Sequence, residues 1–144
     1  MQDYNVKHLG SLTELEVMTY LFKLGYQVSI PYGDNAPYDL ILEVNNKLFK
    51  IQVKTSRKIE EGVYEFTCIR TRINKHQNIR KAYSDKEVDF FATMINGICY
   101  LVPFNETSNS KRLRFLPPKN NQVKGITFAE EYEAEIQLNR LVNN

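Results

Sequence analysis

The sequence predicts an α/β or α+β fold, with a mixed β-sheet flanked by helices. Its 144 residues suffice for one domain with its own hydrophobic core, which we place over residues 1–144. Apolar residues follow helical spacing near both ends of the chain and alternate with polar residues between them. Asparagine-containing turns at residues 45–46 and 96–97 separate alternating segments, as in β-hairpins.

Composition indicates a globular protein without a membrane partner. Hydrophobic residues make up 42% of the chain, but no apolar run is long enough to cross a bilayer. With no secretory leader recognised at the start, we expect a cytoplasmic protein. Cys68 and Cys99 are isolated in expected strands, which favours buried thiols over zinc ligands.

The first helix is expected over residues 10–24. Ser11 and Glu14 match the S-x-x-E capping box, and Gly25 is suited to end the helix. Glu14 also falls near the middle of an apolar arc, formed by Leu15, Val17, Met18, Leu21, Phe22 and Leu24. A carboxylate there is costly unless a partner compensates it, so Glu14 has either a functional role, a capping role, or both.

A short strand at residues 27–30 and a polar loop at 31–37 lead to the central hairpin. Residues 39–44 and 49–54 alternate around Asn45-Asn46, a pair that tolerates positive φ. In the second segment the apolar residues face the core, and the opposite face carries Lys50, Gln52 and Lys54.

Asp39 begins the first of these strands, so one carboxylate, one amide and one ammonium meet at adjoining strand ends. Such a group is suited to binding a metal ion and a phosphate. The alternative is that Asp39 accepts hydrogen bonds from loop amides, while Gln52 and Lys54 belong to a solvated face.

Beyond the hairpin, residues 58–62 indicate a polar turn. Residues 63–69 are expected to form the third strand of the sheet, with Tyr64, Phe66 and Cys68 on one side. A loop or short helix is expected over 70–81. Residues 88–95 and 98–104 then form a second hairpin, whose last strand carries Pro103 as an edge strand allows.

Residues 105–125 are expected to form an extended surface segment. Thr127 and Glu130 match a second capping box, and Phe128, Tyr132 and Ile136 follow at helical spacing. This last helix packs either on the core or on a partner subunit.

The net charge of +2 does not by itself indicate nucleic-acid binding, but the basic residues are clustered. Two basic segments, residues 70–81 and 107–129, contain no Asp or Glu. The candidate DNA contacts in the first segment are Arg70, Arg72, Lys75, His76, Gln77, Arg80 and Lys81. The alternative is a solvated, charged loop.

The order of a helical Glu, Pro37-Tyr38-Asp39 before a strand, and Gln52-Val53-Lys54 in the next strand resembles the PD-(D/E)xK nuclease superfamily. It is most similar to the branch that includes group I intron-associated homing endonucleases. The resemblance covers residues 10–103 and implies a restriction-endonuclease-like core.

The resemblance also implies a catalytic site of Glu14, Asp39, Gln52 and Lys54. Asp39, the Gln52 side chain and the Val53 carbonyl would bind Mg²⁺, with Mn²⁺ as a substitute, and Glu14 would hold a water or a second ion. Lys54 would orient or deprotonate the attacking water. Gln52 departs from the usual acid, so weaker metal binding is expected.

The implied function is site-specific, metal-dependent cleavage of double-stranded DNA. Two strands require two active sites, so a homo-oligomer, dimer or tetramer, is expected. The alternatives are a structure-selective nuclease resembling Holliday-junction resolvases, a restriction enzyme, or a DNA-binding module whose catalytic site has decayed.

Overall fold

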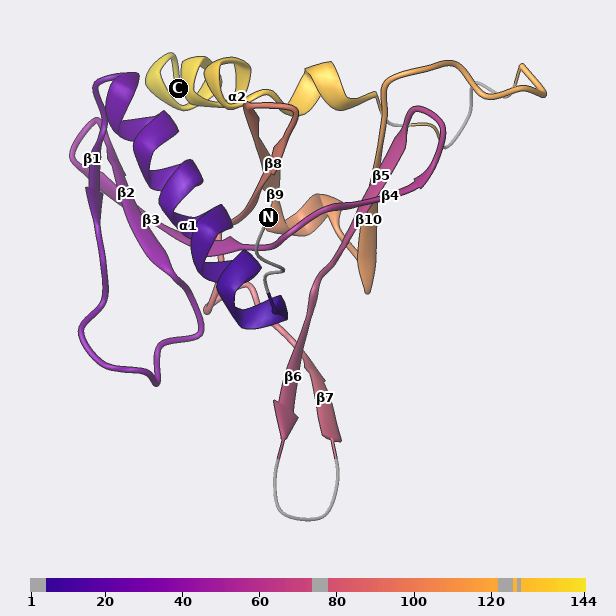
Figure 1. The fold of residues 1–144 in the computed structure, drawn as a ribbon. Helices are drawn as coiled ribbons and strands as arrows, with labels where there is room; N and C mark the ends of the chain where they lie inside the picture. The colour runs from indigo at the N-terminus through magenta and orange to yellow at the C-terminus, as the bar shows by residue number, and fades with distance from the viewer. Residues whose placement is uncertain (1–4, 74–77, 122–125, 127) are drawn as a thin grey trace.

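The protein is described by a computed structural model that covers residues 5–73, 78–121, 126 and 128–144. A five-stranded sheet lies at its centre, with strand order β1-β2-β3-β8-β9 (Figure 1). Its strands are β1 (Gln27–Ser29), β2 (Leu40–Val44), β3 (Lys47–Val53), β8 (Phe90–Ile95) and β9 (Ile98–Pro103). All neighbouring pairs are antiparallel except β3 and β8, which are parallel, so the expected mixed sheet is confirmed.

Two helices, α1 (Val6–Lys23) and α2 (Ala134–Val142), cover one face of this sheet (Figure 1). The helices and the sheet share one core. It includes Val17 and Leu21 of α1, Leu138 of α2, and the sheet residues Leu42, Ile51, Ala92 and Leu101. The last helix therefore packs on the core. Ile136, one of the residues expected on its apolar face, is nevertheless exposed.

The opposite face of the central sheet is covered by a second sheet, with strand order β10-β5-β4. Its strands are β4 (Arg57–Glu60), β5 (Val63–Thr67) and β10 (Ser110–Arg114). Two expectations are thereby wrong. Residues 63–69 do not supply the third strand of the central sheet, and residues 105–125 are not wholly an extended surface segment, because β10 pairs with β5. The turn expected at 58–62 is also shorter, since β4 continues to Glu60.

The physical reason is found by comparing β8, which takes the place beside β3 in the central sheet, with β5, which was expected there. β8 begins with three buried apolar residues, as suits a strand covered on both faces. β5 carries Glu65, which faces Arg57 on β4 at 3.3 Å and Arg112 on β10 at 2.9 Å. The hydrogen bond from Arg112, and to a lesser extent that from Arg57, lowers the pKa of Glu65. Both arginines are largely exposed, so this arrangement requires a sheet with one hydrated face.

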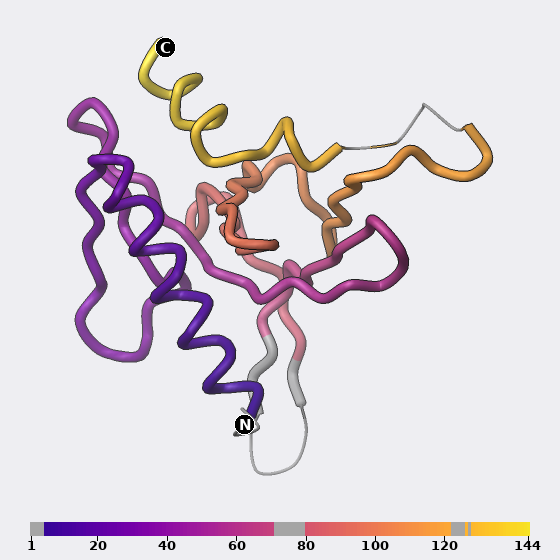
Figure 2. The backbone as a smooth tube through the Cα atoms, turned by 45° about the horizontal axis from the view of Figure 1, so that its top comes forward, coloured from indigo at the N-terminus to yellow at the C-terminus, as the bar shows by residue number. Residues whose placement is uncertain are grey.

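The basic segment forms a two-stranded hairpin, β6 (Ile69–Ile73) and β7 (Asn78–Ala82), rather than a loop or short helix. It projects away from both sheets (Figure 1 and Figure 2). A ribbon that packs on neither sheet needs no continuous apolar face. Only the five residues of β6 alternate, and β7 does not, so the pattern is too short to predict a hairpin.

The first helix begins earlier than expected. Asn5 is its N-cap, and its side chain accepts a hydrogen bond from the His8 N–H at 2.8 Å. Ser11 therefore lies inside the helix, and the capping box of Ser11 and Glu14 is wrong. Gly25 adopts φ +95° just after the helix, as expected. Leu15 and Phe22, expected in the core, are 57% and 66% exposed.

Of the second expected capping box, Thr127 lies outside the described residues. Glu130 lies in a 3-10 helix, Ala129–Tyr132, which directly precedes α2 and whose N-cap is Phe128. A second 3-10 helix, Phe104–Glu106, follows β9.

The cysteines are buried, as expected, and burial raises the pKa of Cys68 to about 11 and of Cys99 to about 12. Across the described parts of the chain, neither helix combines the length and apolarity needed to span a membrane.

Leu42→Ala is expected to destabilise the protein by about 2–5 kcal/mol, because Leu42 is fully buried between β2 and the helices and its loss leaves a cavity. Leu48→Ala is the matched control, since Leu48 lies on the paired strand β3 and is 65% exposed. Urea unfolding of both variants measures the difference. Equal losses would contradict the assignment of these strand faces.

Candidate active site

Asp39 and the end of β3 are fixed to each other by two hydrogen bonds. The Asp39 N–H donates to the Ile51 carbonyl at 2.8 Å, and the Asp39 carboxylate accepts from the Val53 N–H at 2.9 Å. The carboxylate therefore serves an amide of the neighbouring strand rather than the loop amides considered above. This pairing places Asp39 beside the Gln52-Val53-Lys54 segment.

Lys54 is not a freely solvated surface lysine. Its ammonium donates to the Ile69 carbonyl at 3.1 Å and lies 5.1 Å from the centre of the Tyr83 ring. Burial lowers the pKa of Lys54, while the nearby Asp39 carboxylate opposes that shift. The ammonium is therefore held at the base of the β6–β7 hairpin.

Glu14 reaches the same site from the middle of α1. Burial, and to a lesser extent the nearby charge of Asp39, raises its pKa to about 7. Burial also raises the pKa of Asp39, although the Val53 N–H and the Lys54 ammonium act in the opposite direction. The charge of Asp39 thus acts on both Glu14 and Lys54.

A hydroxyl pair fixes the helix against this site. Thr13, next to Glu14, donates to the Leu9 carbonyl at 2.9 Å and shares a second hydrogen bond with Thr55 at 2.9 Å. A hydroxyl has one hydrogen, so Thr55 is the donor in the second bond. This contact joins α1 to the residue after Lys54. The one hint of this contact in the sequence is that Thr13, a polar residue next to Glu14, falls on the inward face of the helix.

Gln52 lies at the end of β3, opposite Phe91 of the parallel strand β8. Its half-buried side-chain amide approaches the Val53 carbonyl at 3.5 Å, a long hydrogen bond. Two of the expected metal ligands, the Gln52 side chain and the Val53 carbonyl, therefore lie next to each other.

These donors fit a hard divalent cation. Glu14 and Asp39 supply carboxylates whose mutual repulsion a cation would relieve, and the Val53 carbonyl and Gln52 amide supply neutral oxygens. Among the residues that the structure describes, no three His, Cys, Asp or Glu side chains gather as a ready metal site. The group suits an ion such as Mg²⁺, which retains waters and needs few protein ligands.

The expected DNA contacts are only partly described. Arg80 and Lys81 are exposed on β7, and Arg70 on β6 pairs with Glu87 at 3.2 Å. Arg72 lies in β6, but its side chain is outside the description, as are Lys75, His76 and Gln77 altogether. The described residues nevertheless place basic side chains along the projecting hairpin.

Tyr83 is the site residue that sequence reasoning missed. It follows β7 directly and is buried, with the Lys54 ammonium and the Arg70 guanidinium near its ring. A single aromatic residue after a basic segment carries no sequence signal for this position.

Comparisons with known proteins gave a match to one family and to one fold. The sequence model of the PD-(D/E)XK endonuclease family matches residues 4–135. The fold is similar to the solved structure of the bacterial homing endonuclease I-Ssp6803I, with a TM-score of 0.75 and 24% identity over 98% of this chain and 99% of that one. No curated protein matches the chain.

In the absence of metal, the protein is expected to lose stability as pH rises from about 4.5 to about 7. The pKa of Glu14 is about 7 in the folded protein, above its ordinary value of 4.5. Below pH 4.5 the carboxyl is protonated in both states and costs no stability. Between pH 4.5 and 7 it ionises in the unfolded chain but not in the folded protein, which favours unfolding. Asp39 contributes with the same sign. Glu14→Gln should therefore become more stable than the wild type across this interval.

Urea unfolding in EDTA between pH 4 and pH 8 measures this difference. Glu16→Gln, exposed on the same helix, is the control and should follow the wild type. Parallel stability profiles for the wild type and Glu14→Gln would contradict the buried, charge-coupled position of Glu14.

Proposed function

Because the chain belongs to the PD-(D/E)XK endonuclease family, we propose that it is a divalent-metal-dependent enzyme that cleaves double-stranded DNA at specific sites. The observation that carries this proposal is the convergence of Glu14, Asp39 and Lys54. They come from helix α1, from the residue before β2 and from the residue after β3. Two hydrogen bonds, from the Val53 N–H to Asp39 and between Thr13 and Thr55, bring these segments together.

In this proposal Asp39 is the anchoring metal ligand, assisted by the Gln52 side chain and the Val53 carbonyl. The Gln52 amide must present its oxygen rather than its nitrogen to the ion, which a rotation about its terminal bond achieves. Glu14 holds a water or a second ion. When bound, Mg²⁺ or Mn²⁺ supplies positive charge that activates water and stabilises the phosphate charge.

Lys54 orients or deprotonates the attacking water and stabilises negative charge on the phosphate. An ammonium has three donors, and the Ile69 carbonyl occupies one of them in this structure. The remaining donors are available to a water and to a phosphate oxygen. The lowered pKa of Lys54 also suits proton transfer better than that of a fully solvated lysine.

The β6–β7 hairpin is the proposed DNA contact. A two-stranded β-ribbon fits the major groove, and its basic residues neutralise phosphates. The hairpin and the β1–β2 connection that leads to Asp39 project from the same side of the molecule (Figure 1). A duplex seated on the hairpin would therefore lie on the side from which Asp39 is approached.

Site specificity and a homo-oligomer, dimer or tetramer, belong to the same proposal. The fold neighbour I-Ssp6803I is described as a homing endonuclease, which supports sequence-specific cutting. Cutting both strands of a duplex with one site per chain requires at least two chains, and cyclic symmetry supplies them most simply.

Cleavage of a duplex library in Mg²⁺ is the test. Asp39→Asn should lower the cleavage rate by about 10²-fold or more, because it removes the anchoring charge, and Lys54→Ala by about 10²–10⁴-fold. Asp34→Asn, the same substitution in the exposed β1–β2 connection, is the control and should cleave like the wild type.

A wild type that cleaves no better than Lys54→Ala across the library would overturn the proposal. The neutral amide of Gln52 favours one rival, a DNA-binding module with a decayed site. Cleavage that appears only in Gln52→Glu would support that rival. Preference for a four-way junction over linear duplex would instead indicate a structure-selective nuclease.

Arg80→Ala combined with Lys81→Ala is expected to weaken DNA binding and to reduce its salt dependence. Each lost phosphate contact should lower the slope of log affinity against log salt by about 0.9. Fluorescence anisotropy over a range of salt concentrations measures both. Lys47→Ala, exposed at the turn between β2 and β3, is the control. An unchanged slope in the double variant would exclude the hairpin as the DNA contact.

A further inference from the structure

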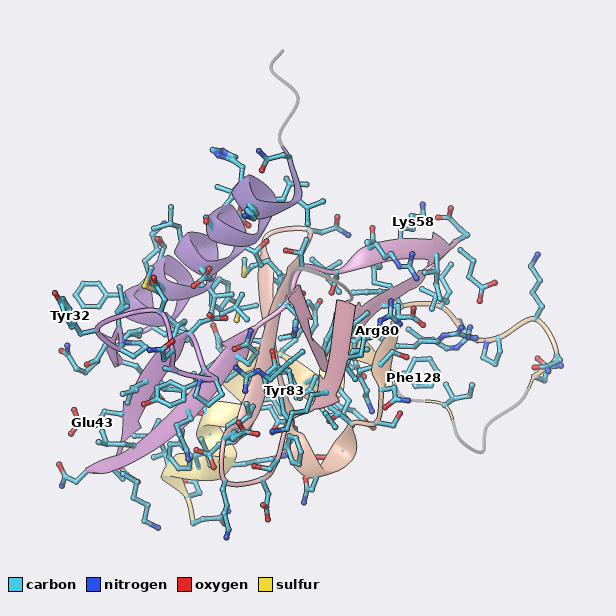
Figure 3. The ribbon with its side chains drawn as sticks, turned by 90° about the horizontal axis from the view of Figure 1, so that it is seen from below. Tyr32, Glu43, Lys58, Arg80, Tyr83 and Phe128 are labelled. Atoms are coloured by element: carbon cyan, nitrogen blue, oxygen red, sulfur yellow. The ribbon has the colours of Figure 1, made fainter. Side chains whose placement is uncertain are left out.

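Tyr83 lies at the base of the β6–β7 hairpin, between the DNA-contacting ribbon and the proposed catalytic site. It is 8% exposed and follows the last residue of β7. The Lys54 Nζ is 5.1 Å from the centre of its ring, and the Arg70 Cζ is 5.7 Å from the same centre. Both distances fall within the range of a cation–π contact. Figure 3 labels Tyr83 near the middle of the face seen from below.

The ring of Tyr83 is itself held in place by other aromatic side chains. It meets Phe91 edge to face, with centroids 5.5 Å apart and planes at 76°. Phe91 is fully buried and packs in turn against Phe66 and Phe104. Because the ring is already fixed by this packing, little side-chain entropy of Tyr83 is lost when Lys54 contacts it.

The second cation at this ring is neutralised. Arg70 pairs with Glu87 at 3.2 Å, and Glu87 also accepts a hydrogen bond from the Ser84 N–H at 2.9 Å. The turn after Tyr83 thus supplies a carboxylate that offsets the Arg70 charge. This pairing reduces the repulsion between Arg70 and Lys54 next to one ring.

Both contacts of the Lys54 ammonium come from the base of the hairpin. Ile69, whose carbonyl accepts from Lys54, is the first residue of β6, and its partner Ala82 is the last residue of β7. Tyr83 comes next in the chain. The head group of Lys54 is therefore located by the hairpin, although its backbone directly follows β3.

We propose that Tyr83 is a positioning residue for the DNA-cleavage reaction, whose ring holds the Lys54 ammonium between the Ile69 carbonyl and the reacting phosphate. A lysine has a long, flexible side chain, and without the ring its charged end turns toward solvent. This inference rests on the proposed nuclease function for its catalytic consequence. The contact between Lys54 and Tyr83 itself is independent of it.

The competing explanation is that Tyr83 serves only as a core aromatic residue. Replacement by Phe keeps the ring and replacement by Leu removes it. Tyr64→Leu is the matched control, because Tyr64 packs against the same core and meets Phe115 edge to face at 5.7 Å. A purely structural role predicts similar effects of Tyr83→Leu and Tyr64→Leu.

The first measurement is the NMR spectrum of the metal-free protein with labelled lysine. The ε-methylene protons next to the Lys54 ammonium should be shifted upfield by the ring current of Tyr83. Lys54→Arg identifies the signal. We expect the shift to persist in Tyr83→Phe and Tyr64→Leu and to disappear in Tyr83→Leu. Its absence from the wild type would overturn the proposal whether or not the protein cleaves DNA.

The second measurement is the single-turnover cleavage rate in Mg²⁺ on the duplex that the wild type cleaves, with DNA affinity measured separately in Ca²⁺. Tyr83→Leu should lower the rate about tenfold, the order of one partly buried cation–π contact, with DNA affinity changed by less than about twofold. Tyr83→Phe should restore the rate to within about twofold of the wild type.

A wild-type rate in Tyr83→Leu would overturn the positioning role, as would an equal loss in Tyr64→Leu at a temperature where both variants are folded. Failure of the wild type to cleave any duplex is a failure of the proposed function instead. In that case the NMR result decides whether Tyr83 holds Lys54.

Discussion

The hydrogen bond from the Val53 N–H to the Asp39 carboxylate is the interaction on which the rest of the site depends. It joins the start of β2 to the end of β3, and so places Asp39 beside Lys54. A second contact, between the Thr13 and Thr55 hydroxyls, fixes α1 against the same strand end and brings Glu14 with it. Three separate elements therefore meet at one position because two specific hydrogen bonds hold them there.

The charges at this position are not balanced by the protein alone. Burial raises the pKa of Glu14 and Asp39 and lowers that of Lys54, so each group is less stable in its charged form than in water. The fold tolerates this because a buried apolar cluster lies on each face of the central sheet, one against the helices and one against the second sheet. Destabilised charges supported by a stable scaffold are typical of catalytic sites, and a divalent cation would relieve the repulsion of the two carboxylates.

Local features were predictable from the sequence, and distant pairings were not. Asn45, Asn46, Asn96 and Gly97 all adopt positive φ, so both hairpin turns followed from residue type. Asp39, Gln52 and Lys54 could be grouped because one hairpin contains them. The parallel pairing of β3 with β8, the second sheet, and the contact of Tyr83 with Lys54 join segments far apart in the chain. No local pattern specifies such contacts, and in the charged β6–β7 hairpin only the five residues of β6 alternate, which is too short a pattern to identify a strand pair.

The most direct test of the central claim is the position of a bound ion. Crystals of the wild type grown with Mn²⁺ should show an anomalous-difference peak in contact with the Asp39 carboxylate and the Val53 carbonyl, with the Gln52 amide rotated to present its oxygen. Crystals of Asp39→Asn should lack this peak. A manganese ion bound elsewhere, or an unchanged peak in Asp39→Asn, would contradict a catalytic site organised around Asp39.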